Sequence, residues 1–301
     1  MQDFYPFGHQ ITVAKTSHDG SVIVGYDQTD QVAFRWSSSD GVTLLGTLGG
    51  ALSAAYGVSA DGKVVVGLAD TAGFGQRAFR WTKEGGMVSL GTLGGDSSHA
   101  YAVNGDGSVV VGRSTASDGR SQAFIWKAST GMRVLGNLDV TSATSVAQGI
   151  SDDGTVVIGQ RQAGMSWEGF RWTEAGAFQY YIQSFIPYGM SADGSVLVGT
   201  TPNGAARWTA SSGVTLLGTL GGSMSGGSDI SNDGSIIVGR SQDSSGQDRA
   251  YYWTAAKGMV NLGTLGGDGS SANGISGDGR FIVGDSSLAN GMARGFWMLT
   301  P

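Results

Sequence analysis

Chemistry in this chain would have to come mainly from carboxylates, because the other reactive side chains are scarce. The 301 residues hold 24 Asp plus Glu, three His (His9, His18 and His99) and no Cys. Without Cys there is no thiolate nucleophile, no disulfide framework and no Cys-ligated zinc, and three His leave little for a His-ligated metal. We therefore expect neither a bound metal nor a cofactor.

Aspartate is concentrated in an Asp-Gly pair that recurs along the chain. The preference of this pair for positive φ predicts a type I′ turn between two strands. A calcium loop would need further carboxylates at alternate positions, which only Asp152-Asp153 and Asn232-Asp233 approach, so we favour turn formation over metal binding. The pairs begin at Asp19, Asp61, Asp106, Asp153, Asp193, Asp233 and Asp278.

Catalysis by the other acids would need a specific arrangement. Seven of the 24 acids belong to the Asp-Gly pairs, which leaves 17. Hydrolysis of a glycosidic bond uses two carboxylates about 5–10 Å apart, and an α/β-type serine hydrolase uses a G-x-S-x-G turn before a helix. Neither a carboxylate pair nor such a turn is evident.

The elements that must position these side chains are β-strands. Glu occurs three times and Lys five times, whereas Gly occurs 53 times and Val, Ile, Thr and Ser abound, so helix formers are scarce. Short β-branched runs recur, and no segment keeps apolar residues at helical spacing for three turns. We predict an all-β chain, whose 40% hydrophobic content supports a sizeable core.

The strands are organised by an internal repeat of about 45 residues. Each unit reads V-S-A-D-G-x-V-V-V-G, a variable stretch, A-F-R-W and then G-M-V-x-L-G-T-L-G-G, and seven units follow one another. Successive repeat tryptophans are 45, 45, 46, 36, 45 and 44 residues apart. They are Trp36, Trp81, Trp126, Trp172, Trp208, Trp253 and Trp297.

Each unit predicts four strands, which in the second unit lie at 56–59, 63–68, 77–82 and 87–91. One four-stranded antiparallel sheet per roughly 40–45 residues is the signature of a propeller blade. We therefore predict a single domain over 1–301, a seven-bladed β-propeller with four antiparallel strands per blade. The seventh unit lacks a fourth strand, and residues 4–8 are expected to supply it and to cover the unpaired edge.

The repeated residues have structural interpretations that come before functional ones. We predict that the repeat Trp and the aromatic residue before it pack between adjacent blades. The Arg that directly precedes the Trp is expected to hydrogen-bond a carbonyl of the next blade, and the Gly that ends V-V-V-G to let two backbones approach closely. These arginines are Arg35, Arg80, Arg171 and Arg207.

The second unit also carries a resemblance to a known family. Its segments GVSADG (57–62), VVVG (64–67), AFRW (78–81) and LGTLGG (90–95) resemble the HAF repeats of bacterial extracellular proteins and autotransporter passenger regions. The resemblance covers nearly the whole chain. It implies a secreted or surface-displayed bacterial protein, with the export signal not in this sequence, and it implies no particular activity.

The repeat breaks most in unit four, and propeller loops are where function is grafted. The predicted loop at 160–168 holds Trp167, the one Trp outside the repeat position, with Met165 and Glu168 beside it. The equivalent loop of unit five, 200–204, is short, which predicts a notch between the two. Trp167 suits sugar stacking or a protein partner, and the alternative is that it covers the shortened neighbour.

Further candidates for ligand binding are Tyr180, Tyr181 and Tyr188. Tyr180 and Tyr181 belong to the altered outer strand predicted at 178–186, where a partner patch and simple packing are equal alternatives. Phe74 of unit two and His99, in a predicted crossover, are expected on the same face as Trp167. Separately, Asp229 is the one remaining acid that we clearly place near the propeller axis, and its partner is not evident.

Composition narrows the classes of partner. The net charge of −6 gives no basic footprint for nucleic acid, and no run of about 18 apolar residues marks a membrane span. We predict a non-enzymatic binding or adhesion module of an exported protein. It would recognise a glycan or a host or extracellular protein through the face with the loops between second and third strands and the blade-to-blade crossovers. A carbohydrate-active enzyme and a structural scaffold are the alternatives.

Overall fold

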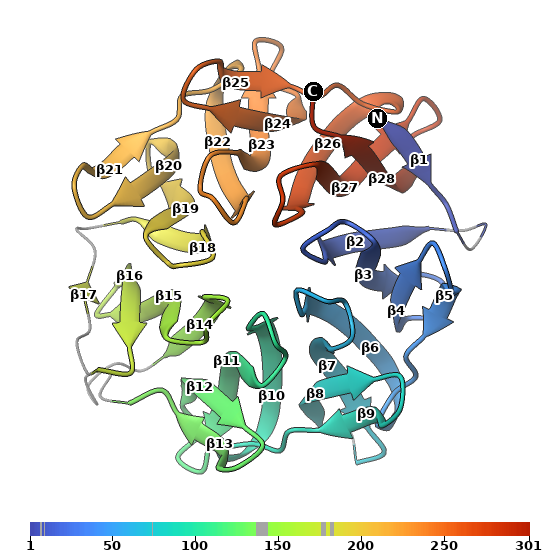
Figure 1. Ribbon diagram of the computed structural model, residues 1–301, viewed down its shortest axis with the longest axis vertical. Helices are drawn as coiled ribbons and strands as arrows, with labels where there is room; N and C mark the ends of the chain where they lie inside the picture. The colour runs from blue at the N-terminus through green and yellow to red at the C-terminus, as the bar shows by residue number, and fades with distance from the viewer. Residues whose placement is uncertain (7, 9, 74, 137–143, 176–178, 181–183) are drawn as a thin grey trace.

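The computed structural model describes the chain except for residues 7, 9, 74, 137–143, 176–178 and 181–183 and the side chains of 179 and 180. Its strands form seven four-stranded antiparallel sheets that stand radially about one axis (Figure 1). The prediction of an all-β, seven-bladed propeller is therefore confirmed. In the described part of the chain, no helix is long and apolar enough to cross a membrane.

Each blade runs from an inner strand beside the axis to an outer strand at the rim. Blade one is β2 (Ile11–Thr16), β3 (Val22–Asp27), β4 (Val32–Ser37) and β5 (Gly41–Leu44). Blade two is β6 (Gly49–Val58), β7 (Val65–Thr71), β8 (Gln76–Thr82) and β9 (Gly86–Ser89). Blade three is β10 (Gly94–Val103), β11 (Val109–Ala116), β12 (Ser121–Lys127) and β13 (Gly131–Val134).

The remaining blades follow the same order. Blade four is β14 (Ser145–Ile150), β15 (Val156–Ala163), β16 (Ser166–Thr173) and β17 (Gln179–Tyr180). Blade five is β18 (Ile186–Met190), β19 (Val196–Thr201), β20 (Gly204–Thr209) and β21 (Gly213–Leu216). Blade six is β22 (Gly221–Ile230), β23 (Ile237–Asp243), β24 (Asp248–Thr254) and β25 (Gly258–Asn261).

Blade seven contains both ends of the chain. It consists of β26 (Gly266–Ile275), β27 (Phe281–Leu288), β28 (Ala293–Leu299) and β1 (Gln2–Phe4), and the two termini lie side by side in Figure 1. β1 pairs antiparallel with β28, from Gln2 opposite Trp297 to Phe4 opposite Gly295. The predicted closure by an N-terminal strand is thus correct. Its predicted position at 4–8 is wrong, because the strand spans Gln2–Phe4 and Phe4 is the only described residue of that segment within it.

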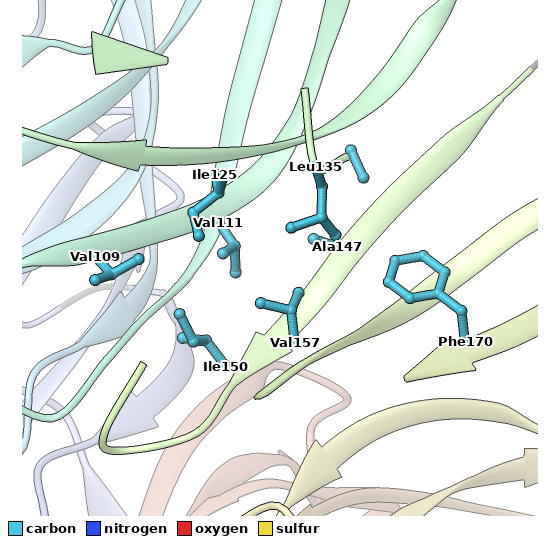
Figure 2. Packing of buried hydrophobic residues seen from close by; sticks show 9 residues of the cluster. Val109, Val111, Ile125, Leu135, Ala147, Ile150, Val157 and Phe170 are labelled. Atoms are coloured by element: carbon cyan, nitrogen blue, oxygen red, sulfur yellow. The ribbon is translucent and has the colours of Figure 1, made fainter. Parts of the chain in front are cut away.

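The hydrophobic core is divided among the interfaces between neighbouring blades, which we call seams. Figure 2 shows the 3/4 seam, where Val111 and Ile125 of blade three meet Ala147, Val157 and Phe170 of blade four. The repeated aromatic residues are central to this packing, as predicted. The aromatic residue two positions before the end of each A-F-R-W-type segment is 0% exposed at Phe34, Phe79, Phe124, Phe170 and Tyr251.

The repeated glycine at the centre of the second strand has no room for a side chain. A Cβ at Gly67 would stand 1.9 Å from the carbonyl oxygen of Ala54 on the inner strand and 2.9 Å from the ring of Phe79 on the third strand. The inner strand and the aromatic ring therefore both press on this backbone. The predicted reason for the glycine, close approach of two backbones, is confirmed.

The turn that joins inner and second strands differs from the predicted type I′ turn. In the turn between β2 and β3 only Gly20 has positive φ (+74°), and Asp19 does not. The Gly20 N–H donates to the Ser17 carbonyl, and the Ser17 N–H donates to the Val22 carbonyl, which makes a four-residue loop. The Asp19 carboxylate accepts the Ser17 hydroxyl and the Ser21 N–H, each at 2.9 Å. Side-chain capping, and not a second residue with positive φ, therefore shapes the loop.

The arginine before the repeat Trp bridges the seam in three blades, as predicted. The Nε–H groups of Arg35, Arg80 and Arg171 donate to carbonyls of Gly62, Gly107 and Gly194, at 3.0, 3.1 and 3.3 Å. Each acceptor glycine belongs to the Asp-Gly loop of the next blade. Arg207 departs from the pattern, because its buried Nε has no hydrogen-bond partner and its guanidinium lies over the Trp253 ring at 6.0 Å.

Strand register corrects the assignment of Trp297. In blade two the central glycine of the second strand faces Phe79, so Arg80 and Trp81 follow that pair. In blade seven the equivalent Gly284 faces Phe296, so Trp297 takes the arginine position and Met298 the tryptophan position. Trp297 still packs between blades, as expected, but against blade one, in a cluster with Phe4 of β1 and with Ile11 and Trp36 of blade one.

Candidate functional site

The inner strand of every blade contains a β-bulge at the same position. In blade two the pairing of β6 with β7 shifts register between Ala55 and Gly57, which leaves Tyr56 as the extra residue. A bulge turns the extra residue away from the regular alternation of the strand and re-aims its side chain. We call the seven extra residues the bulge ring. They are Ala14, Tyr56, Tyr101, Gln148, Tyr188, Ser228 and Asn273.

The bulge ring lines three adjoining cavities around the axis. The innermost, of about 160 Å³, includes Tyr56, Tyr101, Gln148 and Tyr188 in its wall. A second, of about 460 Å³, shares Tyr188 and also touches Asn273, and a third, of about 330 Å³, shares Tyr56 and Asn273. The two larger cavities lie toward the start of the inner strands, where the chain crosses from blade to blade. We call this composite space the axial funnel.

One wall of the axial funnel is aromatic. The rings of Tyr56 and Tyr101, from blades two and three, have centroids 5.6 Å apart and are tilted by 33°. The Tyr101 ring also meets the edge of His99, with 6.2 Å between centroids. Burial raises the pKa of Tyr56, Tyr101 and Tyr188. These phenols therefore remain neutral groups that both donate and accept hydrogen bonds.

His99 supports this wall from the 2/3 seam. Its Nε2 lies 3.0 Å from Gln76 Oε1, while Arg113 Nη2 and the Tyr101 hydroxyl lie 3.3 and 3.4 Å from its Nδ1. The Arg113 guanidinium is only a donor, so Nδ1 accepts and Nε2 carries the proton. Burial, with the charge of Arg113, lowers the pKa of His99 to about 4. A neutral imidazole therefore holds Tyr101 in place at neutral pH.

An ion pair spans the funnel wall one residue beyond the bulge ring. Lys15 Nζ of blade one lies 2.8 Å from Asp229 Oδ2 of blade six, and the same oxygen accepts the Ile275 N–H at 3.1 Å. Asp229 lies by the axis as predicted, and Lys15 is the partner that the sequence did not reveal. A carboxylate held in this way is already neutralised by a cation and fixed by a backbone donor.

A closed circuit of peptide hydrogen bonds surrounds the other end of the axis. In each Asp-Gly loop the residue before Asp donates its N–H to the equivalent carbonyl of the next blade, at 2.9–3.1 Å; in blade seven Asp278 is the donor instead. We call these positions the turn ring. They are His18, Ala60, Gly105, Asp152, Ala192, Asn232 and Gly277.

Side chains of the turn ring bridge the axial opening. Asn232 Nδ2 lies 2.8 Å from Asp152 Oδ2 and 3.0 Å from His18 Nδ1, which joins blades six, four and one. There is no space for a larger residue at the neighbouring position, because a Cβ at Gly277 would lie 2.3 Å from His18 Nδ1. Burial raises the pKa of Asp152. The funnel therefore narrows onto a polar bridge at this end.

The predicted Trp167 loop is mostly strand. β15 and β16 continue to a two-residue turn at Gly164 and Met165, with Gln162 opposite Trp167. Met165 is fully exposed and Trp167 is 40% exposed, whereas Glu168 pairs with Arg161 at 3.1 Å. Because β19 and β20 of blade five turn two residues earlier on each side, this hairpin extends beyond its neighbour. We call it the blade-four hairpin.

The other candidate residues are dispersed. Tyr188 lies in the axial funnel. The prediction that His99 lies in a crossover is wrong, because His99 belongs to β10. Tyr180 belongs to β17, but its side chain, like Phe74 and Tyr181, lies outside the described residues. The candidates therefore separate into Met165, Trp167 and Glu168 on the blade-four hairpin and Tyr188 in the funnel, with His99 behind the Tyr101 wall.

The sequence did not reveal the bulge ring, although a signal for it exists. Its members stand three residues before the Ser or Asn that opens each Asp-Gly loop, and six of the seven are polar or aromatic. Aligning the seven units on that Ser or Asn brings them to one position, although neighbouring positions vary as well. Among the residues that the structure describes, no group of three or more His, Cys, Asp or Glu could hold a metal ion.

Comparisons with known proteins identify the fold. No family model and no curated protein sequence matches this chain. Among solved structures, it is similar to the β-propeller domain of the trilobed protease from Pyrococcus furiosus, with 11% identity, TM-score 0.60 and coverage of 96% of this chain and 92% of that one. The chain is also similar to a putative TolB from Agrobacterium tumefaciens, with 13% identity and a TM-score of 0.52. That match covers 97% of this chain and 91% of the other.

TolB from Acinetobacter baumannii is also similar, at 16% identity and a TM-score of 0.51. The match covers 66% of this chain and 51% of that one, so this chain spans about half the length of that protein. Identities this low support the propeller architecture and nothing beyond it.

Proposed function

We propose that this protein is a non-enzymatic binding module that takes the end of a glycan chain into the axial funnel. The observation that carries the proposal is the bulge ring. Six of its seven side chains are Tyr, Gln, Ser or Asn, and all seven residues line the cavities of the axial funnel instead of the packed core. Ligand sites typically combine a concave aromatic surface with a few polar groups that fix orientation.

The chemistry of the funnel fits a neutral polyol better than an ion. Tyr56 and Tyr101 offer ring faces on which the C–H face of a sugar packs, while Gln148 offers a paired donor and acceptor. The nearby charges Lys15 and Asp229 neutralise each other. Hydroxyl groups can therefore be bound without leaving a buried charge unpaired.

Catalysis finds less support in the same residues. Asp152 and Asp229 both line the innermost cavity, yet each carboxylate already has a partner, Asn232 for the first and Lys15 for the second. Glycoside hydrolysis requires one carboxyl to donate a proton while the other attacks or activates water. Binding without turnover therefore remains the function that we propose.

The blade-four hairpin is the second candidate surface, for a host or extracellular protein. It carries a fully exposed Met165 and a 40% exposed Trp167 beyond the edge of blade five. Exposed Trp and Met are enriched where proteins meet. The resemblance of the repeats to HAF repeats supports secretion or surface display by a bacterium, which is the setting in which either ligand would be met.

The experiment is a glycan array probed with the protein and two variants. We expect saturable binding of a glycan to the wild-type protein. In Tyr188→Ala its affinity should fall roughly tenfold, about 1–2 kcal/mol, because a stacking or hydrogen-bonding ring is lost from the funnel. Tyr188 is 40% exposed, so the fold should survive. Trp167→Ala is the matched control, an exposed aromatic residue on the hairpin.

The outcomes separate the proposals. Binding that is retained in Tyr188→Ala but lost in Trp167→Ala places the site on the blade-four hairpin and rejects the funnel. Failure to bind any glycan rejects the glycan proposal, and an extracellular-matrix protein array with the same variants then tests the hairpin. Release of a shorter glycan during incubation would contradict the non-enzymatic part.

A further inference from the structure

A fourth cavity, which shares no lining residue with the axial funnel, lies at the seam where the propeller closes. Its volume is about 290 Å³, and it opens beside the Asp-Gly loop of blade one. Its wall is aromatic and aliphatic on one side and polar at the loop. We call it the closing-seam cavity. It is lined by Asp19, Gly20, Ser21, Ile23, Trp36, Ser38, Phe281, Val283 and Trp297.

The other seams show what normally occupies this place. In blades one, two and four an arginine extends along the seam and donates Nε–H to the glycine carbonyl of the next Asp-Gly loop. The strand register puts Trp297 of blade seven in that arginine position, and Gly20 is the corresponding glycine. Among the described residues, no side chain donates to the Gly20 carbonyl. The closing-seam cavity is thus an arginine slot from which the arginine is missing.

Replacing the arginine does not by itself create a cavity. Ile125 and Tyr252 hold the same position in blades three and six, where they are 6% and 2% exposed and fill their seams. Trp297 instead packs toward Phe281 and the blade-one core, with 6.2 Å between the ring centroids of Phe281 and Trp297. The Phe281 ring packs against Gly20 from one side, and the cavity of about 290 Å³ remains between Gly20, Trp36 and Trp297.

The chemistry of the wall fits a cation that is flat and carries several N–H donors. Asp19 lines the cavity, and hydrogen bonds from Ser21 hold the pKa of its carboxyl below the ordinary value, so it is ionised at neutral pH. Trp36 and Trp297 supply aromatic faces, on which guanidinium groups stack readily. Arg207 shows this contact within the chain, over Trp253 of the next blade.

We propose that the closing-seam cavity binds the guanidinium group of an arginine side chain from a partner peptide. The guanidinium would lie between Trp36 and Trp297, donate to the Gly20 carbonyl and face the Asp19 carboxylate. It would reproduce the contact that Arg35 makes in the 1/2 seam. This site is separate from the axial funnel, so it does not depend on what the funnel binds.

The test is a titration followed by the indole N–H signals of the tryptophans in ¹H–¹⁵N NMR spectra. The probe is N-acetyl-arginine amide, and N-acetyl-citrulline amide is its uncharged counterpart of nearly equal shape. We expect saturable shifts of the Trp36 and Trp297 signals with the arginine probe and at least tenfold weaker binding of the citrulline probe. Equal binding of the two probes, or no saturable shift, would overturn the proposal.

Variants locate the site. Trp297→Arg gives blade seven the residue of the standard seam, so the chain's own guanidinium should occupy the slot and abolish binding of the probe. Trp167→Ala removes a distant exposed Trp and should leave binding unchanged. A Trp297→Arg protein that folds and still binds the probe at Trp36 contradicts the slot.

Asp19→Asn gives an independent answer if Trp297→Arg does not fold. It keeps the loop geometry, removes the charge and should weaken the arginine probe about tenfold, with little effect on the citrulline probe. Unchanged arginine binding in this variant would overturn the role of the carboxylate. Free L-arginine tests the source of the group, because its charged α-ammonium and carboxylate groups replace the neutral amides of a peptide. Binding as tight as that of the amide would assign the cavity to a small guanidine and not to a peptide.

Discussion

The 1/2 seam and the closing seam between blades seven and one perform the same task with different residues. In the 1/2 seam, Val22 packs against Gly62 and Arg35 bonds the Gly62 carbonyl. In the closing seam, Phe281 packs against Gly20 and Trp297 replaces the arginine. A repeat can specify one standard interface many times, but the interface that joins the two ends of the chain lies outside the repeat and is built from exceptions.

Two further exceptions strengthen the closing seam. Phe4 of β1 is 5% exposed and packs edge-on against Trp36, with 5.3 Å between centroids. The half-buried Asp285 of β27 accepts the Val13 N–H of blade one at 3.1 Å and the Asn273 amide at 2.7 Å. The closing seam therefore depends on an added aromatic residue and a half-buried carboxylate, where the 1/2 seam depends on an arginine and a glycine.

The largest effect is expected from Phe4→Ala. The substitution removes a buried ring from the cluster that holds β1 to blades seven and one, so the free energy of unfolding should fall by about 3–5 kcal/mol. Urea denaturation of the variant and the wild type measures the difference. A loss below about 1 kcal/mol would mean that β1 is not part of what closes the propeller.

Asp285→Asn should have the next largest effect, and one that depends on pH. Burial raises the pKa of Asp285 to about 6, against 3.8 for a free carboxyl. The folded state therefore favours the protonated form, and the stability it contributes is present below about pH 4 and is lost as the pH rises through 6. The loss is about 3 kcal/mol.

The asparagine variant has no carboxyl to ionise at this position. Its free energy of unfolding should therefore match that of the wild type near pH 4 and exceed it by up to about 3 kcal/mol at pH 7.5. Denaturation curves at a series of pH values from 4 to 8 provide the measurement. A difference between the two proteins that does not change with pH would contradict the half-buried carboxylate as the cause.

Arg35→Met tests the standard seam with a smaller expected change. The methionine keeps most of the apolar length but leaves the Gly62 carbonyl without its donor, which costs about 1–2 kcal/mol. Thermal and urea unfolding should both show it. If the variant is as stable as the wild type, the arginine of the repeat is not what distinguishes the standard seam from the closing one.

Asp40→Asn should have the smallest effect. Asp40 lies on the surface at the same seam, 3.2 Å from Lys83 of blade two and 3.4 Å from Arg35. Exposed ion pairs contribute little and are screened by salt. We expect a slight decrease of the melting temperature at low ionic strength that disappears in 1 M salt, and a decrease that persists in salt would point to a structural role instead.

The architecture could be predicted from the sequence because each repeated residue answers to a local physical need. The spacing of the tryptophans gives the blade period, Phe79 and Gly67 specify each other across two strands, and Arg35 has an acceptor in the next unit. These relations hold within one unit or between consecutive units. Because the unit occurs seven times, one sequence shows each of these relations several times.

The candidate site could be predicted less well because it depends on pairing that single segments do not reveal. The bulge at Tyr56 exists only when β6 is laid against β7, and the ion pair of Lys15 with Asp229 joins segments far apart in the chain. The residue types around Trp167 predict a loop, whereas a two-residue turn at Gly164 and Met165 lets both strands continue. The one-residue shift of Trp297 is visible only in register.

The turn ring has a consequence for how the propeller assembles. Any row of fewer than seven blades would leave one donor N–H and one acceptor carbonyl unused at its two ends. Only docking of the last blade, where Asp278 donates to the His18 carbonyl, satisfies both at once. The circuit of hydrogen bonds is therefore complete only in the closed ring, so loss or duplication of a unit would require the blades to rearrange into a ring of different radius.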